Sequence, residues 1–247
     1  DNYRNAVIAV AKGKKKTELI EWDSFLWQTL PELVKSREPH HLILAEVAEV
    51  MKWKLSRGKA RPLQKLVESN SEGAVLKASA ASFHLLSKHN WEGAINEITV
   101  LKGVGVATAT AILAPFSPSD IPFMADEVME AVSCHRDYTM KIYKEMRLRL
   151  VQKAKDLQEL SSFQWTAENV GKALWTCAMT AAYPAISFDT SAPPAKQTTD
   201  KHAALMKKES LLLKRTNQDL KQKEDCTDAN AGADDDLERF SKRVKRG

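Results

Sequence analysis

Apolar residues at helical spacing restrict the fold of this chain more than any other feature of its sequence. From Glu18 to Lys35 they recur every three or four residues, as on the buried face of an amphipathic helix. No stretch shows the two-residue alternation of a half-buried strand. Similar helical periods cover the stretches 42–55, 59–69, 73–89, 91–99, 106–114, 124–133, 137–160 and 166–182. The sequence therefore predicts an all-α, compact multi-helix domain over residues 1–186.

The composition changes near Ser187, where a polar run with two prolines begins. We expect residues 187–247 to form a largely disordered charged tail, with an isolated helix near 203–223 and a role in binding a protein partner. Its last residues include a basic run from Lys242 to Arg246, which resembles a nuclear import signal. The run therefore predicts that the protein is nuclear. If the run is not an import signal, we expect a cytoplasmic protein.

Charge and cysteine content restrict the class of partner and site. The chain carries 37 Lys and Arg against 32 Asp and Glu, a net charge of +5, which favours an anionic partner. No run approaches the roughly 18 apolar residues of a membrane span, so no membrane partner is expected. Three cysteines are too few for a disulfide framework, and we expect Cys177 to be a buried core thiol. No His or Cys spacing suits a metal, so we expect neither a metal nor a cofactor. The sequence starts at Asp1 rather than Met, which leaves open that it begins inside a longer chain.

A basic run extends from Met51 to Lys65, with six Lys and Arg side chains and no acid. It is either a solvated surface loop or a patch that attracts an anion. The side chains expected to contact phosphates are those of Lys54, Arg57 and Lys59. Most of the six tryptophans lie among apolar neighbours and are expected in the core. Trp53 is the exception because it lies within the basic run.

The segment 91–132 carries the most specific pattern. A helix over 91–99 is followed by a Gly-x-Gly turn and a second helix rich in small residues. Glycines permit positive φ, and the positive end of the second helix is a natural phosphate site. The pattern resembles a helix-hairpin-helix, a motif that binds the DNA backbone independently of base sequence, and this resemblance implies that Lys102, Gly103, Val104, Gly105 and Thr108 bind DNA. Taken alone, the turn also fits an ordinary tight connection between two helices.

The whole segment resembles the helix-hairpin-helix base-excision DNA glycosylases. In these enzymes the hairpin is followed by a proline-containing loop and an aspartate that opens the next helix, and here Ile121–Asp126 matches that loop and aspartate. The resemblance implies that Asp126 stabilises the cationic sugar of the transition state and orients the attacking water. Glu127 is a weaker substitute. It also implies duplex DNA as partner, a flipped base and a monomeric protein.

Two departures from the family leave alternatives open. Bifunctional members carry a nucleophilic lysine two residues after the second hairpin glycine, where this chain has Ala107. An alanine cannot form a Schiff base, so the resemblance implies a monofunctional enzyme that uses water. The proline also lies closer to the aspartate in many relatives. The alternative is a catalytically inactive helix-hairpin-helix module that binds nucleic acid or protein, and a purely structural helical domain is the third possibility.

Overall fold

The computed structural model describes residues 2–183, and the expectations for residues 184–247 lie outside the described residues. Every regular element in the described part is helical, which confirms the predicted all-α class. The elements are α1 Asn2–Gly13, α2 Leu19–Ser24, the π-helical turn η1 Phe25–Thr29, α3 Leu30–Lys35, α4 Leu44–Arg57, α5 Gln64–Glu68, α6 Glu72–Ser87, α7 Trp91–Thr99, α8 Val106–Leu113, α9 Asp126–Ala131, α10 Met140–Leu160 and α11 Ala167–Ala182. No helix in this part is long and apolar enough to span a membrane.

The helix boundaries have local causes in the sequence. Side chains of Ser71, Asn90 and Thr166 accept hydrogen bonds from backbone N–H groups in the first turns of α6, α7 and α11. The π-helical turn η1 ends two residues before Pro31, which has no N–H to continue the α-helical bonding pattern. The predicted stretch 59–69 shortens to α5, and α1 is a helix to which the sequence analysis assigned no range.

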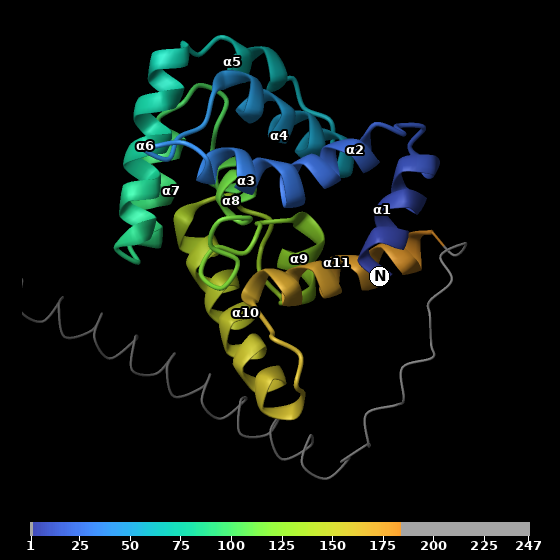
Figure 1. Cartoon of the computed structure of the whole chain (residues 1–247). Coiled ribbons are helices and arrows are strands. Elements are labelled where there is room, and N and C mark those ends of the chain that lie inside the picture. Colours follow the sequence, from blue (N-terminus) through green and yellow to red (C-terminus); the bar gives the residue numbers. More distant parts are fainter. Residues whose placement is uncertain (1, 184–247) are drawn as a thin grey trace, which may run out of the picture. The chain divides into compact units, whose positions relative to one another are not determined.

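Helices α4 and α8 occupy the centre of the fold. Helix α4 packs against α1, α2, α5, α6 and α8, while α8 also packs against α7. Helix α1 also packs against α11, so the first helix and the last described helix are neighbours (Figure 1). Helix α8 is buried from Ala107 to Leu113, and its small residues allow these close contacts.

The structure decides two questions about single side chains. Trp53, for which the sequence left open either the gap of a flipped base or a place inside the fold, is fully buried, and its Nε1 donates to Asp23 Oδ1 at 2.8 Å. Its burial follows from the register of α4, because Val50, Trp53 and Arg57 lie on the same inward face. Cys177, expected in the core, is exposed. It lies on the outer face of α11, while its neighbours Trp175 and Thr176 face inward.

Candidate functional site

The turn between α7 and α8 uses its two glycines differently. Gly103 has φ 77°, the left-handed region, whereas Gly105 has φ −97° and ψ −178° and is the N-cap of α8. A Cβ at Gly103 would lie 2.9 Å from Leu66 Cβ and 3.1 Å from the Val67 backbone nitrogen. Only Gly103 therefore needs positive φ and close approach, and the element that it approaches is α5.

Asn70, just after α5, holds the turn in place. Its Oδ1 accepts from the Lys102 backbone N–H at 2.9 Å, and its Nδ2 donates to the Lys102 carbonyl at 3.0 Å. Nδ2 also donates to the Val67 carbonyl at 2.8 Å. These bonds engage the backbone of Lys102, a residue that we expected to contact DNA, in fixing the turn.

The N-terminus of α8 presents free backbone donors. The N–H groups of Val106 and Ala107 have no backbone partner within residues 2–183, while the N–H groups of Thr108 and Ala109 both donate to the Gly105 carbonyl at 2.9 Å. A Cβ at Gly105 would meet no atom within 4 Å, so the space beside this N-cap residue is open. Such an end favours an anion through both its donors and the helix dipole.

The loop that leads to Asp126 is held by hydrogen bonds from three other elements. Glu168 Oε2 accepts from the Phe123 N–H at 2.7 Å, and Thr110 Oγ1 accepts from the Met124 N–H at 3.1 Å. The Tyr143 hydroxyl donates to the Pro122 carbonyl at 3.2 Å. These contacts from α11, α8 and α10 set the direction in which α9 begins.

Asp126 is the first residue of α9, and Ala125 is the N-cap. The Tyr138 hydroxyl donates to Asp126 Oδ1 at 2.6 Å. Burial and this hydrogen bond raise the pKa of Tyr138. The carboxylate therefore has one fixed donor on one oxygen.

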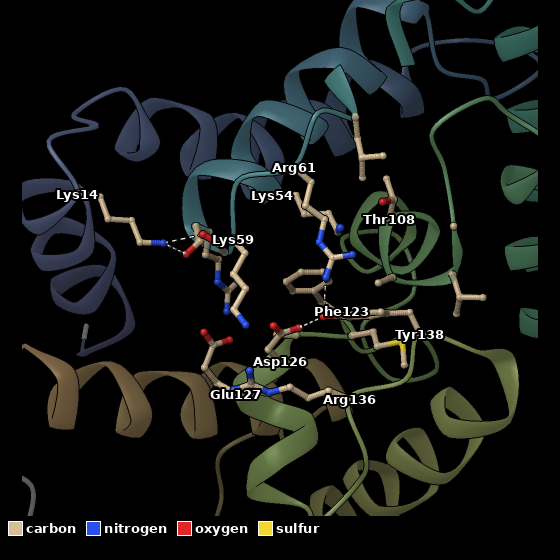
Figure 2. A pocket seen from close by; sticks show the side chains of 18 residues that line it. Lys14, Lys54, Lys59, Arg61, Thr108, Phe123, Asp126, Glu127, Arg136 and Tyr138 are labelled. Carbon is tan, nitrogen blue, oxygen red and sulfur yellow. Dashed lines mark hydrogen bonds between the residues drawn. The ribbon is translucent and has the colours of Figure 1, made fainter. Parts of the chain in front are cut away.

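Asp126 lines a cavity of about 270 Å³ between the N-terminus of α8, the end of α4 and the start of α9. Figure 2 shows Lys59 extending toward Glu127 and Asp126, and Arg61 extending toward Tyr138. The charged side chains that line it are Lys14, Lys54, Arg57, Lys59, Arg61, Arg136, Asp126 and Glu127. Positive charge therefore exceeds negative charge around the cavity.

These cations differ in how they are engaged. The Lys14 amine donates to the Arg57 and Gly58 carbonyls at 2.6 and 2.8 Å and so caps the end of α4. Arg136 pairs with Glu130, and Arg61 donates to the Tyr138 hydroxyl at 3.3 Å.

The side-chain amines of Lys54 and Lys59 make no hydrogen bond or ion pair in the described part of the chain. Lys54 is partly buried, whereas Lys59 is exposed. Burial, together with the Arg61 cation, lowers the pKa of Lys54, and the Asp126 carboxylate acts in the opposite direction. Both lysines thus keep a free amine, which is partly buried at Lys54 and exposed at Lys59.

Arg57 lies in an aromatic cage rather than on an open surface. It is 5% exposed, and its guanidinium carbon lies 4.0 Å from the Trp175 ring centroid and 5.0 Å from that of Trp53. Neither Nε nor Nη1 has a hydrogen-bond partner within residues 2–183. Its place beneath the cavity differs from the exposed phosphate contact that the basic run led us to expect, because residue 57 lies on the buried face of α4.

The expected site residues divide between two places. The cavity brings together Asp126, Gly105, Thr108, Lys54, Arg57 and Lys59. Lys102, Gly103 and Val104 lie in the preceding turn and do not line it. Thr108 is buried, and its N–H is engaged within the helix.

Sequence reasoning missed Lys14, Arg136 and Tyr138. They approach the cavity from distant parts of the chain, and no local pattern marks them. Arg61 carried a signal, because it belongs to the basic run. Within the described residues, no group of three or more His, Cys, Asp and Glu side chains is placed to hold a metal ion.

Comparison with protein-family models, curated proteins and solved structures finds no match to this chain. The resemblance of segment 91–132 to the glycosylases therefore rests on its residues alone.

Proposed function

We propose that the protein binds duplex DNA at the cavity and acts as a monofunctional base-excision DNA glycosylase of the helix-hairpin-helix type. One observation carries the proposal: the open N-terminus of α8, an excess of cationic side chains and the Asp126 carboxylate share one cavity. A glycosylase needs a grip on phosphate and a carboxylate beside the sugar, and this cavity offers both.

In this proposal the N–H groups of Val106 and Ala107 bind a backbone phosphate, as helix N-termini bind anions generally. The side chains of Lys59 and Arg61 neutralise neighbouring phosphates. Such contacts are independent of base identity, so they hold the duplex in register while the target nucleotide leaves the stack.

Asp126 supplies the chemistry. Cleavage of the N-glycosidic bond builds positive charge on the deoxyribose, and a nearby carboxylate stabilises that charge and orients the attacking water. The hydrogen bond from Tyr138 fixes one carboxylate oxygen and leaves the other for water. Ala107 offers no amine on α8, so base removal proceeds by water.

The second candidate is a module of the same kind that binds nucleic acid without catalysis. The cation-rich cavity supports it equally, because phosphate binding alone requires no carboxylate. The two candidates differ only in what Asp126 does, which a transition-state mimic can reveal.

The test compares undamaged duplex with duplex carrying a cationic abasic-site analogue. We expect the analogue to bind at least about a hundredfold more tightly, because transition-state mimics exceed ground states by that margin or more. Asp126→Asn removes the preference, while Glu127→Gln, the matched control on the neighbouring cavity carboxylate, keeps it. Equal binding of both duplexes by the wild type would leave the non-catalytic module. No binding at low salt would remove DNA from the account.

A further inference from the structure

Arg57 is a buried cation at the cavity to which the proposed function gives no role. Its side chain lines the cavity although only 5% of the residue is exposed. Nε and Nη1 are sealed from solvent and have no hydrogen-bond partner within residues 2–183. The ion pairs of the same part of the chain do not include Arg57. A buried charge without an anionic partner is costly to the fold, so a role in binding is the first to consider.

Four aromatic rings surround the guanidinium. Its carbon lies 4.0 Å from the ring centroid of Trp175, 5.0 Å from that of Trp53, 5.3 Å from that of Phe123 and 5.8 Å from that of Tyr3. Cation–π contacts of this kind attract the charge through the ring faces, but they accept none of the N–H groups in the way that an oxygen does. The rings therefore hold in place a side chain that still has donors to offer.

Arg57 is reached only from within the cavity. Nη2 is the guanidinium nitrogen that is not sealed from solvent, and it makes no hydrogen bond within residues 2–183. Phe123, which is 7% exposed, lines the same cavity and offers an aromatic surface to a flat group. A phosphate on the surface of a duplex meets exposed cations such as Lys59, whereas a group that meets Arg57 has to enter. In DNA the group able to enter is a base turned out of the stack.

The chemistry of a guanidinium restricts which base it can bind. Arginine has five N–H donors and no acceptor. A carbonyl oxygen on the base edge accepts a hydrogen bond from it, whereas an exocyclic amine at the same position sets donor against donor and leaves both groups unpaired. Sites that bind a substrate through a buried polar group reject analogues that cannot pair with that group.

We propose that Arg57 determines the substrate class of the cavity by selecting a flipped base that carries a carbonyl oxygen where the ordinary base carries an exocyclic amine. Hypoxanthine and adenine differ in this way, and so do uracil and cytosine. The inference rests on the proposed function, which supplies the flipped base. Asp126 keeps its proposed role at the sugar, and Arg57 contacts the base alone.

The test measures binding of the full chain to two duplexes that differ at one nucleotide, hypoxanthine or adenine. Fluorine at C2′ of that nucleotide prevents loss of the base. The quantity compared is the ratio of the two affinities, because the cost of flipping each base is the same for every variant. We expect Arg57→Met to lower the preference for hypoxanthine about tenfold or more, since it removes a hydrogen bond from a charged group. Arg57→Gln, whose amide oxygen can accept from adenine, lowers it as well. Arg136→Gln, the matched control at the cavity arginine that pairs with Glu130, keeps the wild-type ratio.

The salt dependence of binding to undamaged duplex separates a base contact from a phosphate contact. Arg57→Met should leave the slope of log K against log salt unchanged, because a side chain that meets only the base neutralises no phosphate. A slope lower by about one unit, or a ratio of affinities unchanged in Arg57→Met, would overturn the role of Arg57 while the proposed function stands. No binding by the wild type would overturn the proposed function and this inference with it. Far-ultraviolet circular dichroism checks that Arg57→Met and Arg57→Gln are folded, and either variant is sufficient for the comparison.

Discussion

At the residue scale, Glu168 shows how a buried charge holds the loop before the site. Its carboxylate accepts the Phe123 N–H at 2.7 Å and is 3% exposed. Burial raises the pKa of Glu168, although Lys172, the Phe123 N–H and Arg57 oppose the shift. The ionised carboxylate is therefore a cost to the fold that the hydrogen bond only partly offsets.

This raised pKa predicts a pH-dependent effect of Glu168→Gln. An acid whose pKa is higher in the folded state loses stability as the pH rises from below its unfolded pKa through its folded pKa. Glutamine has no such loss, so the free energy of unfolding of Glu168→Gln relative to wild type should improve between about pH 4 and pH 7. Urea unfolding at both values measures it. A difference independent of pH would contradict the assigned cause.

The two glycines of the turn between α7 and α8 give a matched pair of substitutions. Gly103→Ala should destabilise the fold by about 1–2 kcal/mol or more, because a left-handed φ is strained with a Cβ that also meets α5. Gly105→Ala should change stability by less than about 1 kcal/mol, since its φ is ordinary and the space is open.

The two substitutions should act on DNA binding in the opposite order of their effects on stability. A methyl group at the N-cap of α8 adds bulk next to the free Val106 and Ala107 amides, so Gly105→Ala should weaken duplex binding in a protein of near wild-type stability. Chemical denaturation and fluorescence anisotropy measure the two quantities. Unchanged DNA affinity in Gly105→Ala would remove the α8 terminus from the binding site.

Single residues were easiest to select where they belong to a local pattern. Asp126 was expected from the resemblance of segment 91–132 and Gly105 from the Gly-x-Gly turn, and the structure places both at one cavity. Arg57 was expected to contact phosphate, and Trp53 was left without a firm place in the core, because their neighbours in the sequence are basic. Which face of α4 points inward depends on the helices packed against it, and charge along the chain does not contain that information.

At the element scale, the fold was predictable because helical periodicity is a local property. Helices α6, α7, α10 and α11 lie where the apolar spacing indicated them. The shortening of 59–69 to α5 was not predictable. A five-residue helix is too short to show a clear apolar periodicity, and its stability depends on its contacts with other elements. The clamp between α5 and the hairpin likewise joins residues 32 positions apart.

This clamp predicts the effect of Asn70→Ala. The substitution removes both hydrogen bonds to the Lys102 backbone, so we expect a loss of about 1–3 kcal/mol in the free energy of unfolding. Amide exchange at residues 101–105 should become faster. Asn96→Ala on the exposed side of α7 is the control and should change neither quantity. Equal exchange in both variants would show that the clamp does not hold the turn.

At the scale of the whole molecule, the distribution of charge is more informative than the net charge. The net charge of +5 is small, but cations are concentrated around one cavity that also contains a helix N-terminus. The basic run contributes four of these cations from the end of α4 and the residues after it, namely Lys54, Arg57, Lys59 and Arg61. Lys14 and Arg136 come from other parts of the chain. The amino-acid composition alone does not show that these cations line the same cavity.

The most direct test of the account measures how duplex affinity depends on salt. Each phosphate contact that is lost should reduce the slope of log K against log salt by about one unit. We therefore predict that replacing Lys59 and Arg61 by Gln lowers the slope by up to about two units. Replacing Lys141 and Lys153, on α10 and away from the cavity, removes the same charge and should leave the slope unchanged. Equal slopes for the two double variants, or no binding by the wild type at low salt, would contradict the account.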